Sequence, residues 1–403
     1  MKLHIFALAA HGIGISGGDR IFMELARRWS KKFIIDLYLC KEGFAMCERN
    51  GLKAKGSKLK FVVSKMNPWY KFGFFINYFA RILEGIKLGL TLDLSTDHDL
   101  PTTFLYSASD FWMDVFPCVL LKIRHSKIKW IAGWYQTAPN PLMGYQGGRY
   151  KLSALFYFLS QLPVKPFVSH FADFVFVNNE NERKQFNRLN KKGKVFVFIG
   201  AVDLKRVKEW KSKQSLPLRG KRVKVKKIYD AVFQGRFHPQ KGVVELIDVW
   251  KRVVEKRPDA LLAMIGDGPL MEKVKLQIAN YKLQKNIKLF SYLFDGDQKY
   301  KIFSQSKIVV HPAFYDSGGM AAAEAMAFGL PCVGFNLPSY KSYYPKGMVK
   351  VKVGDLNVFS KTILLLLKNR IYRSKIAKGA VLMIEKSWSW DIRADQVLRF
   401  VNK

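Results

Sequence analysis

The sequence predicts an α/β protein with two Rossmann-like domains, each built on a doubly wound parallel sheet. Its 403 residues are enough for two domains of ordinary size. Short apolar runs alternate with segments of helical periodicity, which is typical of parallel strands covered by helices on both faces. The alternation stops in the polar, basic stretch 203–227 and then resumes, so we expect a weakly structured linker there.

The N-terminal domain is expected over residues 1–203. Its predicted strands are apolar throughout and rich in Val, Ile and Phe, as buried strands are. A glycine pair opens the predicted helix 17–30. Strands are expected at 3–10, 33–40, 104–109, 129–136, 172–179 and 194–200.

The C-terminal domain is expected over residues 204–386, where the same alternation repeats. Strands are expected at 229–237, 260–268, 287–292 and 307–313, and helices at 242–258, 269–283 and 297–306. Parallel sheets bind ligands outside the carboxyl ends of their strands. Two such domains in tandem therefore predict a central cleft that both carboxyl edges face.

Charge and cysteine usage limit the classes of partner. Lys and Arg number 68 against 31 Asp and Glu, a formal net charge of +37. Such an excess predicts an anionic partner: nucleic acid, an anionic membrane or phosphorylated substrates. The four cysteines show no metal-ligand spacing, and no zinc, helix-turn-helix or RNA-binding signature is visible. No stretch is apolar and long enough to predict a transmembrane helix.

The stretch "HPAFYDSGGMAAAEAMAFGLPCV" over 311–333 predicts a strand, a glycine turn and a short helix. Ala favours the helix, and Gly329 followed by Pro331 ends it. Two acids, Asp316 at the strand exit and Glu324 in the helix, flank the turn. Bare glycine N–H groups at a helix N-terminus favour an anion.

Two further loops are expected at carboxyl ends of strands. Gly17 and Gly18 follow the first strand and leave backbone donors open to a phosphate or sugar, although "GIGISGG" is not the dinucleotide-binding pattern. In "FQGRFHPQKG", Arg236 follows a strand and Lys241 precedes a helix. The forked, permanently charged guanidinium of Arg and the mobile ammonium of Lys both suit a diphosphate.

Taken in order, the glycine pair, "GRFHPQKG", "IGDGP" and the two acids with seven residues between them resemble the retaining GT-B glycosyltransferases of family four. The resemblance covers nearly the whole chain. It implies a terminal helix over 387–403 that returns to the N-terminal domain. It also implies transfer of a sugar from a nucleotide-diphosphate donor with retention, without a metal or other cofactor.

The resemblance assigns a role to each site residue. Glu324 would accept hydrogen bonds from the donor ribose, and Asp316 would contact the transferred sugar. Arg236 and Lys241 would offset charge on the leaving diphosphate. The catalytic candidates are therefore Asp316, Arg236 and Lys241, and Glu324 is a donor-binding candidate. The remaining donor-binding candidates are Gly17, Gly18, Ser317, Gly318, Gly319 and Met320.

Two departures from the family pattern concern the acids and the acceptor side. The first acid is Asp316 where the family usually has Glu, which shortens its reach. The family often carries a histidine after the strand "KWIAGWYQ", and Tyr135 and Gln136 stand there. These two are the acceptor-side candidates, with His11 and His170 as alternatives.

The acceptor is inferred from two aromatic segments, 67–90 and 150–167. The first places Phe and Ile at helical spacing with Lys71, Arg81 and Lys87 among them. Such a helix suits the interface of an anionic membrane or, alternatively, a domain core. With the net charge of +37, we expect peripheral docking on the cytoplasmic face of a membrane and a lipid-linked or membrane glycan acceptor.

Two alternatives remain open. One is a GT-B sugar-nucleotide epimerase, which shares the fold without transfer, and the other is a nucleic-acid-binding protein that uses the basic surface. The sequence indicates neither the sugar, the base, the linkage nor the oligomeric state.

Overall fold

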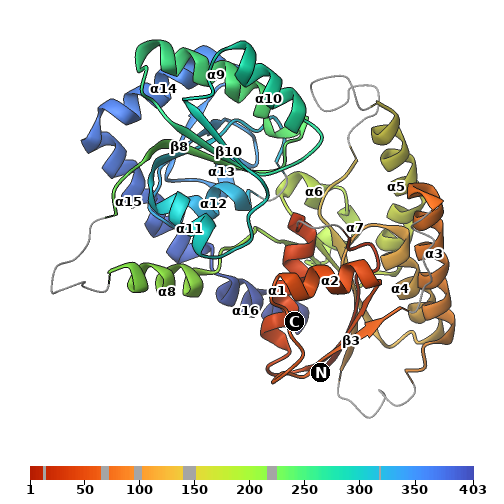
Figure 1. Cartoon of the computed structure of the whole chain (residues 1–403). Helices are drawn as coiled ribbons and strands as arrows, with labels where there is room; N and C mark the ends of the chain where they lie inside the picture. The colour runs from red at the N-terminus through yellow and green to blue at the C-terminus, as the bar shows by residue number, and fades with distance from the viewer. Residues whose placement is uncertain (12–14, 65–71, 95–101, 139–150, 216–224, 317–318) are drawn as a thin grey trace. The chain divides into compact units, whose positions relative to one another are not determined.

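The computed structural model describes the chain except residues 12–14, 65–71, 95–101, 139–150, 216–224 and 317–318. The described residues form two compact domains (Figure 1). The first comprises those within Met1–Gly144, Tyr150–Gly200 and Arg393–Lys403. The second comprises those within Ala201–Ile392.

The first domain contains a seven-stranded sheet in the order β3-β2-β1-β4-β5-β6-β7. Its pairings are parallel; Leu3, for example, lies opposite Ile35 on one side and Phe104 on the other. The strands are β1 (Lys2–Phe6), β2 (Ile34–Leu39), β3 (Leu59–Val63), β4 (Thr103–Ser107), β5 (Lys129–Trp134), β6 (Phe174–Val177) and β7 (Val195–Val197). The doubly wound sheet predicted for this half is confirmed.

Helices of the first domain connect these strands. They are α1 (Gly17–Trp29), α2 (Lys41–Arg49), α3 (Phe74–Thr91), α4 (Trp112–Arg124), α5 (Lys151–Phe171), α6 (Glu180–Lys184) and α7 (Asn187–Lys191). Helix α3 lies very close to α4, because a Cβ at Gly85 would be 2.6 Å from the carbonyl oxygen of Met113. Gly89 makes a similar approach to Pro117.

The second domain contains a six-stranded parallel sheet in the order β10-β9-β8-β11-β12-β13. Its strands are β8 (Tyr229–Gln234), β9 (Leu262–Ile265), β10 (Ile287–Phe290), β11 (Ser306–His311), β12 (Cys332–Phe335) and β13 (Met348–Val351). Its helices are α8 (Leu204–Ser215), α9 (Val243–Lys256), α10 (Met271–Asn280), α11 (Asp297–Ser304), α12 (Met320–Met326), α13 (Tyr340–Tyr343), α14 (Leu356–Lys368) and α15 (Arg370–Ser387).

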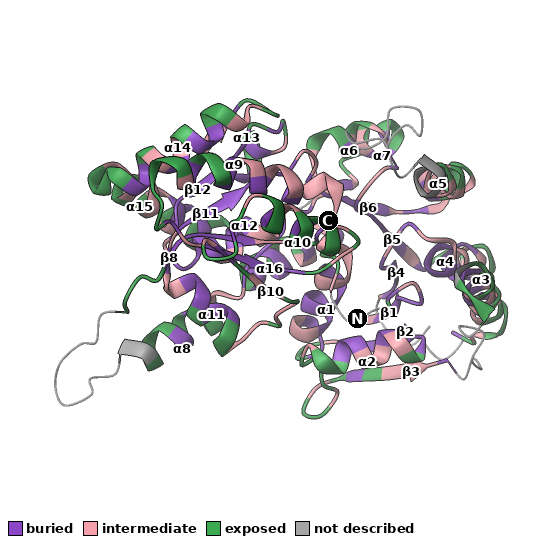
Figure 2. Cartoon of the chain, turned by 45° about the horizontal axis from the view of Figure 1, so that its top comes forward, coloured by how far each residue is buried: buried purple, intermediate pink, exposed green. Residues whose placement is uncertain are grey.

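Helix α16 (Trp390–Val401) closes the chain. Its residues from Arg393 onward belong to the first domain, where the Phe400 ring lies 5.6 Å from Phe174 and 5.1 Å from Phe196. Both sheets are buried between helices whose outer faces are exposed (Figure 2).

The stretch predicted as a weakly structured linker is helical over α8, and that prediction is wrong for these residues. Trp210 is buried and its ring lies 5.7 Å from Phe328 and 6.2 Å from Tyr300. Lys211 donates to the carbonyl oxygen of Ala327. These contacts within the second domain hold α8 in place, although its sequence is mostly polar and basic.

Candidate active site

Charged side chains of the second domain gather in the loops after β8 and β11. Because parallel strands point the same way, these loops emerge at one edge of the sheet. One carries Arg236 and Lys241, and the other carries Asp316. Gly242 allows the loops to touch, because it has a left-handed φ of 63° and a Cβ there would lie 2.0 Å from the carbonyl oxygen of Pro312.

Asp316 is buried and receives hydrogen bonds on both carboxylate oxygens. On Oδ1, Lys241 Nζ lies at 3.0 Å and the backbone N–H of Gly319 at 3.2 Å. On Oδ2, His311 Nε2 lies at 2.7 Å and the Tyr340 hydroxyl at 2.9 Å. A carboxylate accepts about four such bonds, so these donors engage both oxygens of Asp316 strongly.

The electrostatic balance keeps this carboxylate charged. Burial alone would raise the pKa of Asp316, but Lys241 and the hydrogen bond with His311 outweigh it and hold the pKa well below its usual range. Two residues predicted separately, Lys241 and Asp316, are therefore brought together as an ion pair. The structure orients Asp316 toward groups of its own domain.

The loop after β8 is cationic as a whole. Arg236 is exposed, whereas the neighbouring His238 is partly buried. Burial, together with the charges of Arg236 and Lys241, lowers the pKa of His238 to about 4. A neutral imidazole beside two fixed cations leaves a loop that favours an anionic ligand.

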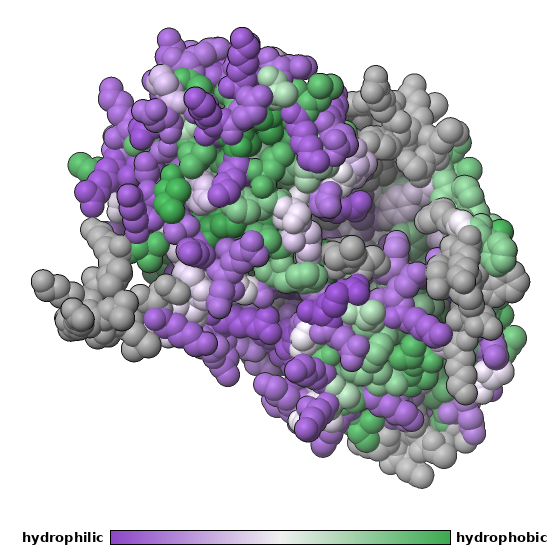
Figure 3. Space-filling model, viewed as in Figure 1, coloured by the Kyte–Doolittle hydropathy of each residue, from purple (hydrophilic) through white to green (hydrophobic). Residues whose placement is uncertain are grey.

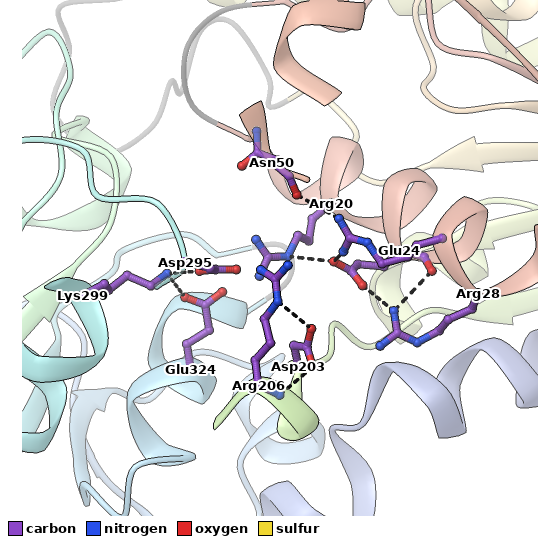
Figure 4. A network of polar contacts seen from close by, with 10 residues as sticks. Arg20, Glu24, Arg28, Asn50, Asp203, Arg206, Asp295, Lys299 and Glu324 are labelled. Atoms are coloured by element: carbon purple, nitrogen blue, oxygen red, sulfur yellow. Dashed lines mark hydrogen bonds and ion pairs between the residues drawn. The ribbon is translucent and has the colours of Figure 1, made fainter. Parts of the chain in front are cut away.

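Glu324 lies on α12 and forms a second ion pair. Its Oε2 accepts from Lys299 Nζ at 2.7 Å and from the Gln234 side-chain amide at 2.9 Å. Lys299 also contacts Asp295 at 2.5 Å, so it bridges the two acids (Figure 4). Gln234 ends β8 and Lys299 lies on α11, which places Glu324 at the same edge of the sheet as Lys241.

The glycine turn is the third part of this edge. Gly319 has a left-handed φ of 63°, and a Cβ there would lie 2.7 Å from the hydroxyl oxygen of Tyr344. That hydroxyl donates to the carbonyl oxygen of Gly319. Met320 begins α12, which has seven residues. The predicted Ser317 and Gly318 lie outside the described residues.

A hollow of about 680 Å³ lies beside the cationic loop, at the carboxyl ends of β9 and β10. Asp267, Gly268 and Phe290 are among its lining residues. Phe237, in the cationic loop, donates its backbone N–H to Asp267, so the hollow and the loop adjoin. Its size falls in the range of small-molecule sites.

The predicted residues of the first domain lie at the carboxyl edge of its sheet. Gly17 and Gly18 begin α1, and Ser16 caps that helix. A Cβ at Gly18 would lie 3.2 Å from the ring of Tyr135. The Tyr135 side chain is buried and shares a 2.5 Å hydrogen bond with the hydroxyl of Tyr106. Burial, together with this neighbouring phenol, raises the Tyr135 pKa well above its usual range.

Gln136 is partly buried and takes part in a polar network. Its carbonyl oxygen accepts from the Tyr157 hydroxyl at 2.9 Å and from the Gln161 amide at 2.8 Å. Both of these donors also contact the buried carboxylate of Asp110. Burial raises the pKa of Asp110 to about 6, although Gln161 and Tyr157 oppose the shift.

Sequence reasoning missed four of these groups. Asp110 closely follows the predicted strand 104–109, and Gln234 closes the strand before Arg236, so both carried a positional signal. Lys299 and Tyr340 carried none, because each lies on a helix of ordinary composition and reaches its acid only through folding.

The two histidines proposed as alternatives differ in place. His11 is exposed, and its Nδ1 lies 2.8 Å from the carbonyl oxygen of Ala9. His170 lies near the carboxyl end of α5, just before β6 begins, and therefore at the opposite edge of the sheet from Tyr135 and Gln136. Within the described part of the chain, no group of three or more His, Cys, Asp and Glu residues could hold a metal ion.

Residues 216–382 match the family described as "Glycosyl transferases group 1". This part of the chain is a group 1 glycosyltransferase domain. It contains Arg236, Lys241, Asp316 and Glu324, and the predicted glycosyltransferase family is confirmed over this segment, whereas retention of configuration stays a prediction.

Relatives and solved structures agree with this assignment. The poly(glycerol-phosphate) alpha-glucosyltransferase of Bacillus subtilis is 26% identical over 161 residues, 39% of this chain and 24% of that protein. The UDP-Gal:alpha-D-GlcNAc-diphosphoundecaprenol alpha-1,3-galactosyltransferase of Escherichia coli is 30% identical over 106 residues, 26% of this chain and 27% of that protein. The chain thus matches about a quarter of the length of each relative.

The structure of Anabaena HepE in complex with UDP and glucose is similar over 100% of this chain and 99% of that one. Its TM-score is 0.69 at 11% identity, which is a likeness of fold. With the two parallel-sheet domains, it confirms the predicted GT-B fold class.

Proposed function

We propose that the protein transfers a sugar from a nucleotide-diphosphate donor to a hydroxyl of an acceptor, with retention of anomeric configuration and without a metal. One observation carries the proposal: Lys241 is held at 3.0 Å from Asp316, beside exposed Arg236, at the carboxyl edge of a group 1 domain. Such an edge is where doubly wound sheets take phosphorylated ligands.

The donor would occupy the cationic loop and the adjoining hollow of about 680 Å³. Arg236 and Lys241 would contact the diphosphate, and Glu324 would accept hydrogen bonds from the ribose. The Anabaena HepE structure is a complex with UDP, so UDP is the first probe for this site.

The chemical step breaks the bond between the anomeric carbon and the diphosphate oxygen. A new bond forms from the acceptor oxygen to the same face of that carbon, and the acceptor proton passes to the leaving phosphate. Negative charge grows on the diphosphate during bond cleavage. Arg236 and Lys241 offset this charge, which makes electrostatic stabilisation the main catalytic contribution.

We assign Asp316 a positioning role in this step. Lys241, Gly319, His311 and Tyr340 all donate hydrogen bonds to its carboxylate, which is buried. Its charge holds the Lys241 ammonium in place beside the donor phosphates. This differs from the predicted direct contact with the sugar, and the shorter Asp in place of Glu fits the difference.

The proposed acceptor is a lipid-linked or membrane glycan reached from the cytoplasmic face, with the protein docked peripherally. The Escherichia coli relative is named for a diphosphoundecaprenol-linked sugar. No described helix is long and apolar enough to cross a membrane. Exposed Phe75, Phe79 and Leu83 on α3 support an interfacial contact.

One part of the membrane prediction is wrong. Arg81, expected among the lipid-facing cations, is buried and pairs with Glu42 while donating to the carbonyl oxygen of Leu8 at 2.9 Å. Lys71 lies outside the described residues.

The deciding experiment is product analysis with a nucleotide-sugar panel after a thermal-shift screen. A ligand at one hundred times its dissociation constant adds about 2.7 kcal/mol of stability. The proposal requires a glycoside with the donor's anomeric configuration, formed equally in the presence of EDTA. An inverted product or loss of activity in EDTA would overturn the mechanism, and conversion of the donor to its epimer without transfer would favour the epimerase.

A further inference from the structure

The outer face of α3 is a stripe of exposed apolar side chains. Phe75, Ile76, Phe79, Leu83 and Leu90 are 44–67% exposed. At 100° per residue they fall on one side of the helix. Gly85 and Gly89 lie outside this arc and pack against α4, so the stripe is separate from the face that contacts the domain.

Helix α5 carries a second stripe. Leu155, Leu159 and Leu162 are 39%, 52% and 53% exposed and recur at intervals of three and four. The Phe75 ring of α3 meets the Phe156 ring of α5 edge-on at 5.4 Å, so the two helices adjoin. Figure 3 shows hydrophobic side chains along the side of this domain where Figure 1 places both helices.

The stripe on α5 leads to a basic hollow. Its spacing continues through Pro166 to His170, and His170 lines a hollow of about 580 Å³ at the carboxyl ends of α4 and α5. Four side chains of the lining are Lys or Arg and a fifth is His, against one acid, Asp173. They are Lys122, His170, Arg188, Lys192 and Lys194.

Most of this positive charge is not neutralised within the hollow. Lys122 pairs with Asp173 at 2.8 Å. Arg188 donates to the carbonyl oxygen of His170, and Lys194 lies over the Phe174 ring at 4.6 Å; both contacts leave the charge in place. Cations at the carboxyl ends of helices also complement the helix dipole. Arg188 and Lys192 do not belong to α4 or α5; they come from α7 and the turn after it.

We infer that the hollow binds the phosphate of an anionic lipid headgroup while the stripes of α3 and α5 enter the interface. Ile123 at the hollow is 59% exposed and continues the apolar surface to its rim. An apolar face bordered by cations matches an anionic membrane, which offers acyl chains and phosphates side by side. This inference deepens the proposed membrane acceptor and rests on it.

The test is sedimentation of the full chain with vesicles of phosphatidylglycerol and phosphatidylcholine, compared with phosphatidylcholine alone. Each cation near an anionic surface changes partitioning by about fivefold. The double variant Arg188→Gln with Lys192→Gln should therefore bind about 25-fold more weakly. The matched control, Lys273→Gln with Lys285→Gln on exposed positions of the second domain, should bind as the parent does.

The apolar contribution is measured separately with Phe79→Ser and Leu83→Ser. This variant should lose the binding that persists at high salt, where electrostatic attraction is screened. Leu276→Ser with Ile371→Ser removes comparably exposed side chains from the second domain and should change nothing. Inorganic phosphate at millimolar concentration should not displace the parent from vesicles, because the lipid contributes both headgroup and interface.

Three outcomes would overturn the inference: equal binding by the hollow variant and its control, equal binding to both vesicle types, or stronger competition by duplex nucleic acid or poly(glycerol phosphate) than by lipid. UDP binding measured on the same proteins separates the two proposals. Loss of vesicle binding with intact UDP binding concerns docking alone, whereas a parent that binds vesicles but no nucleotide sugar would refute the transferase.

Discussion

The two domains share a parallel doubly wound sheet but differ in the charge state of the acids at the carboxyl edges of their sheets. In the second domain, Asp316 has a pKa held well below its usual range, because Lys241 and His311 together outweigh burial. In the first domain, burial raises the pKa of Asp110 to about 6, because the hydrogen bonds from neutral Gln161 and Tyr157 oppose the shift only in part. The same fold thus supports charged groups at one edge and nearly neutral polar groups at the other.

This difference matches the two substrates of the proposed reaction. A diphosphate requires fixed cations, and the second domain supplies Arg236 and Lys241. An acceptor hydroxyl requires neutral hydrogen-bonding partners, and the first domain supplies Gln136 and the groups around it. Four measurements would break or sharpen this contrast.

The largest effect is expected from replacing Asp316, the buried acid that positions Lys241. Asp316→Ala leaves Lys241 and Tyr340 without their buried partner, which should lower the free energy of unfolding by about 3–5 kcal/mol. Asp316→Asn keeps the shape and should remain better folded, yet lower kcat more than it raises KM, since Lys241 loses its anchor. Denaturant unfolding and steady-state kinetics measure both. If Asp316→Asn turned over normally, Asp316 would be only structural.

The second prediction concerns the exposed cation of the same edge. Arg236→Ala should lower kcat by about 10²–10³-fold with a smaller change in UDP affinity, because the charge it offsets grows during bond cleavage. Lys285→Ala removes the same charge from an exposed position elsewhere in the domain and serves as the control. A variant that lost only UDP affinity would make Arg236 a simple binding group.

The third prediction uses the pH dependence of the neutral edge. The pKa of Asp110 is raised from 3.8 to about 6, so the folded state keeps this proton where the unfolded state loses it. The Asp110 proton therefore adds up to about 3 kcal/mol to the free energy of unfolding below about pH 4. This contribution is lost as pH rises to about 6.

Asp110→Asn should flatten this part of the pH profile, measured by denaturant unfolding between pH 4 and 7. Asp259→Asn, on an exposed turn, should not. A profile that Asp110→Asn leaves unchanged would show that Asp110 is already ionised, and the contrast between the edges would fail.

The smallest effect is expected at Glu324. Glu324→Ala removes charge-assisted hydrogen bonds to the ribose and should weaken UDP binding by about 1.5–3 kcal/mol. Lys299→Gln should weaken it less, because Gln234 still contacts the carboxylate. Calorimetry with UDP measures both, with Glu255→Ala as an exposed control. Unchanged affinity in Glu324→Ala would remove this residue from the site.

The sequence by itself determined the fold class and the composition of the charged edge. Alternating apolar strands and helices specify parallel sheets, since only buried strands are apolar on both faces. Parallel strands then bring their exit loops to one edge, so Arg236, Lys241, Asp316 and Glu324 could be grouped without coordinates. The order of these motifs was sufficient to indicate the family.

Only the tertiary structure decided what each charged side chain contacts. Asp316 meets His311 and Tyr340, Glu324 meets Lys299, and Arg81 turns inward to Glu42 instead of outward. Helix α8 is likewise stabilised by the rings that Trp210 meets, while its own sequence is polar. Residue spacing along one helix or strand indicates which face a side chain takes, but not which distant element covers that face. An ion pair forms where burial and packing bring two charges together, and that depends on the whole folded chain.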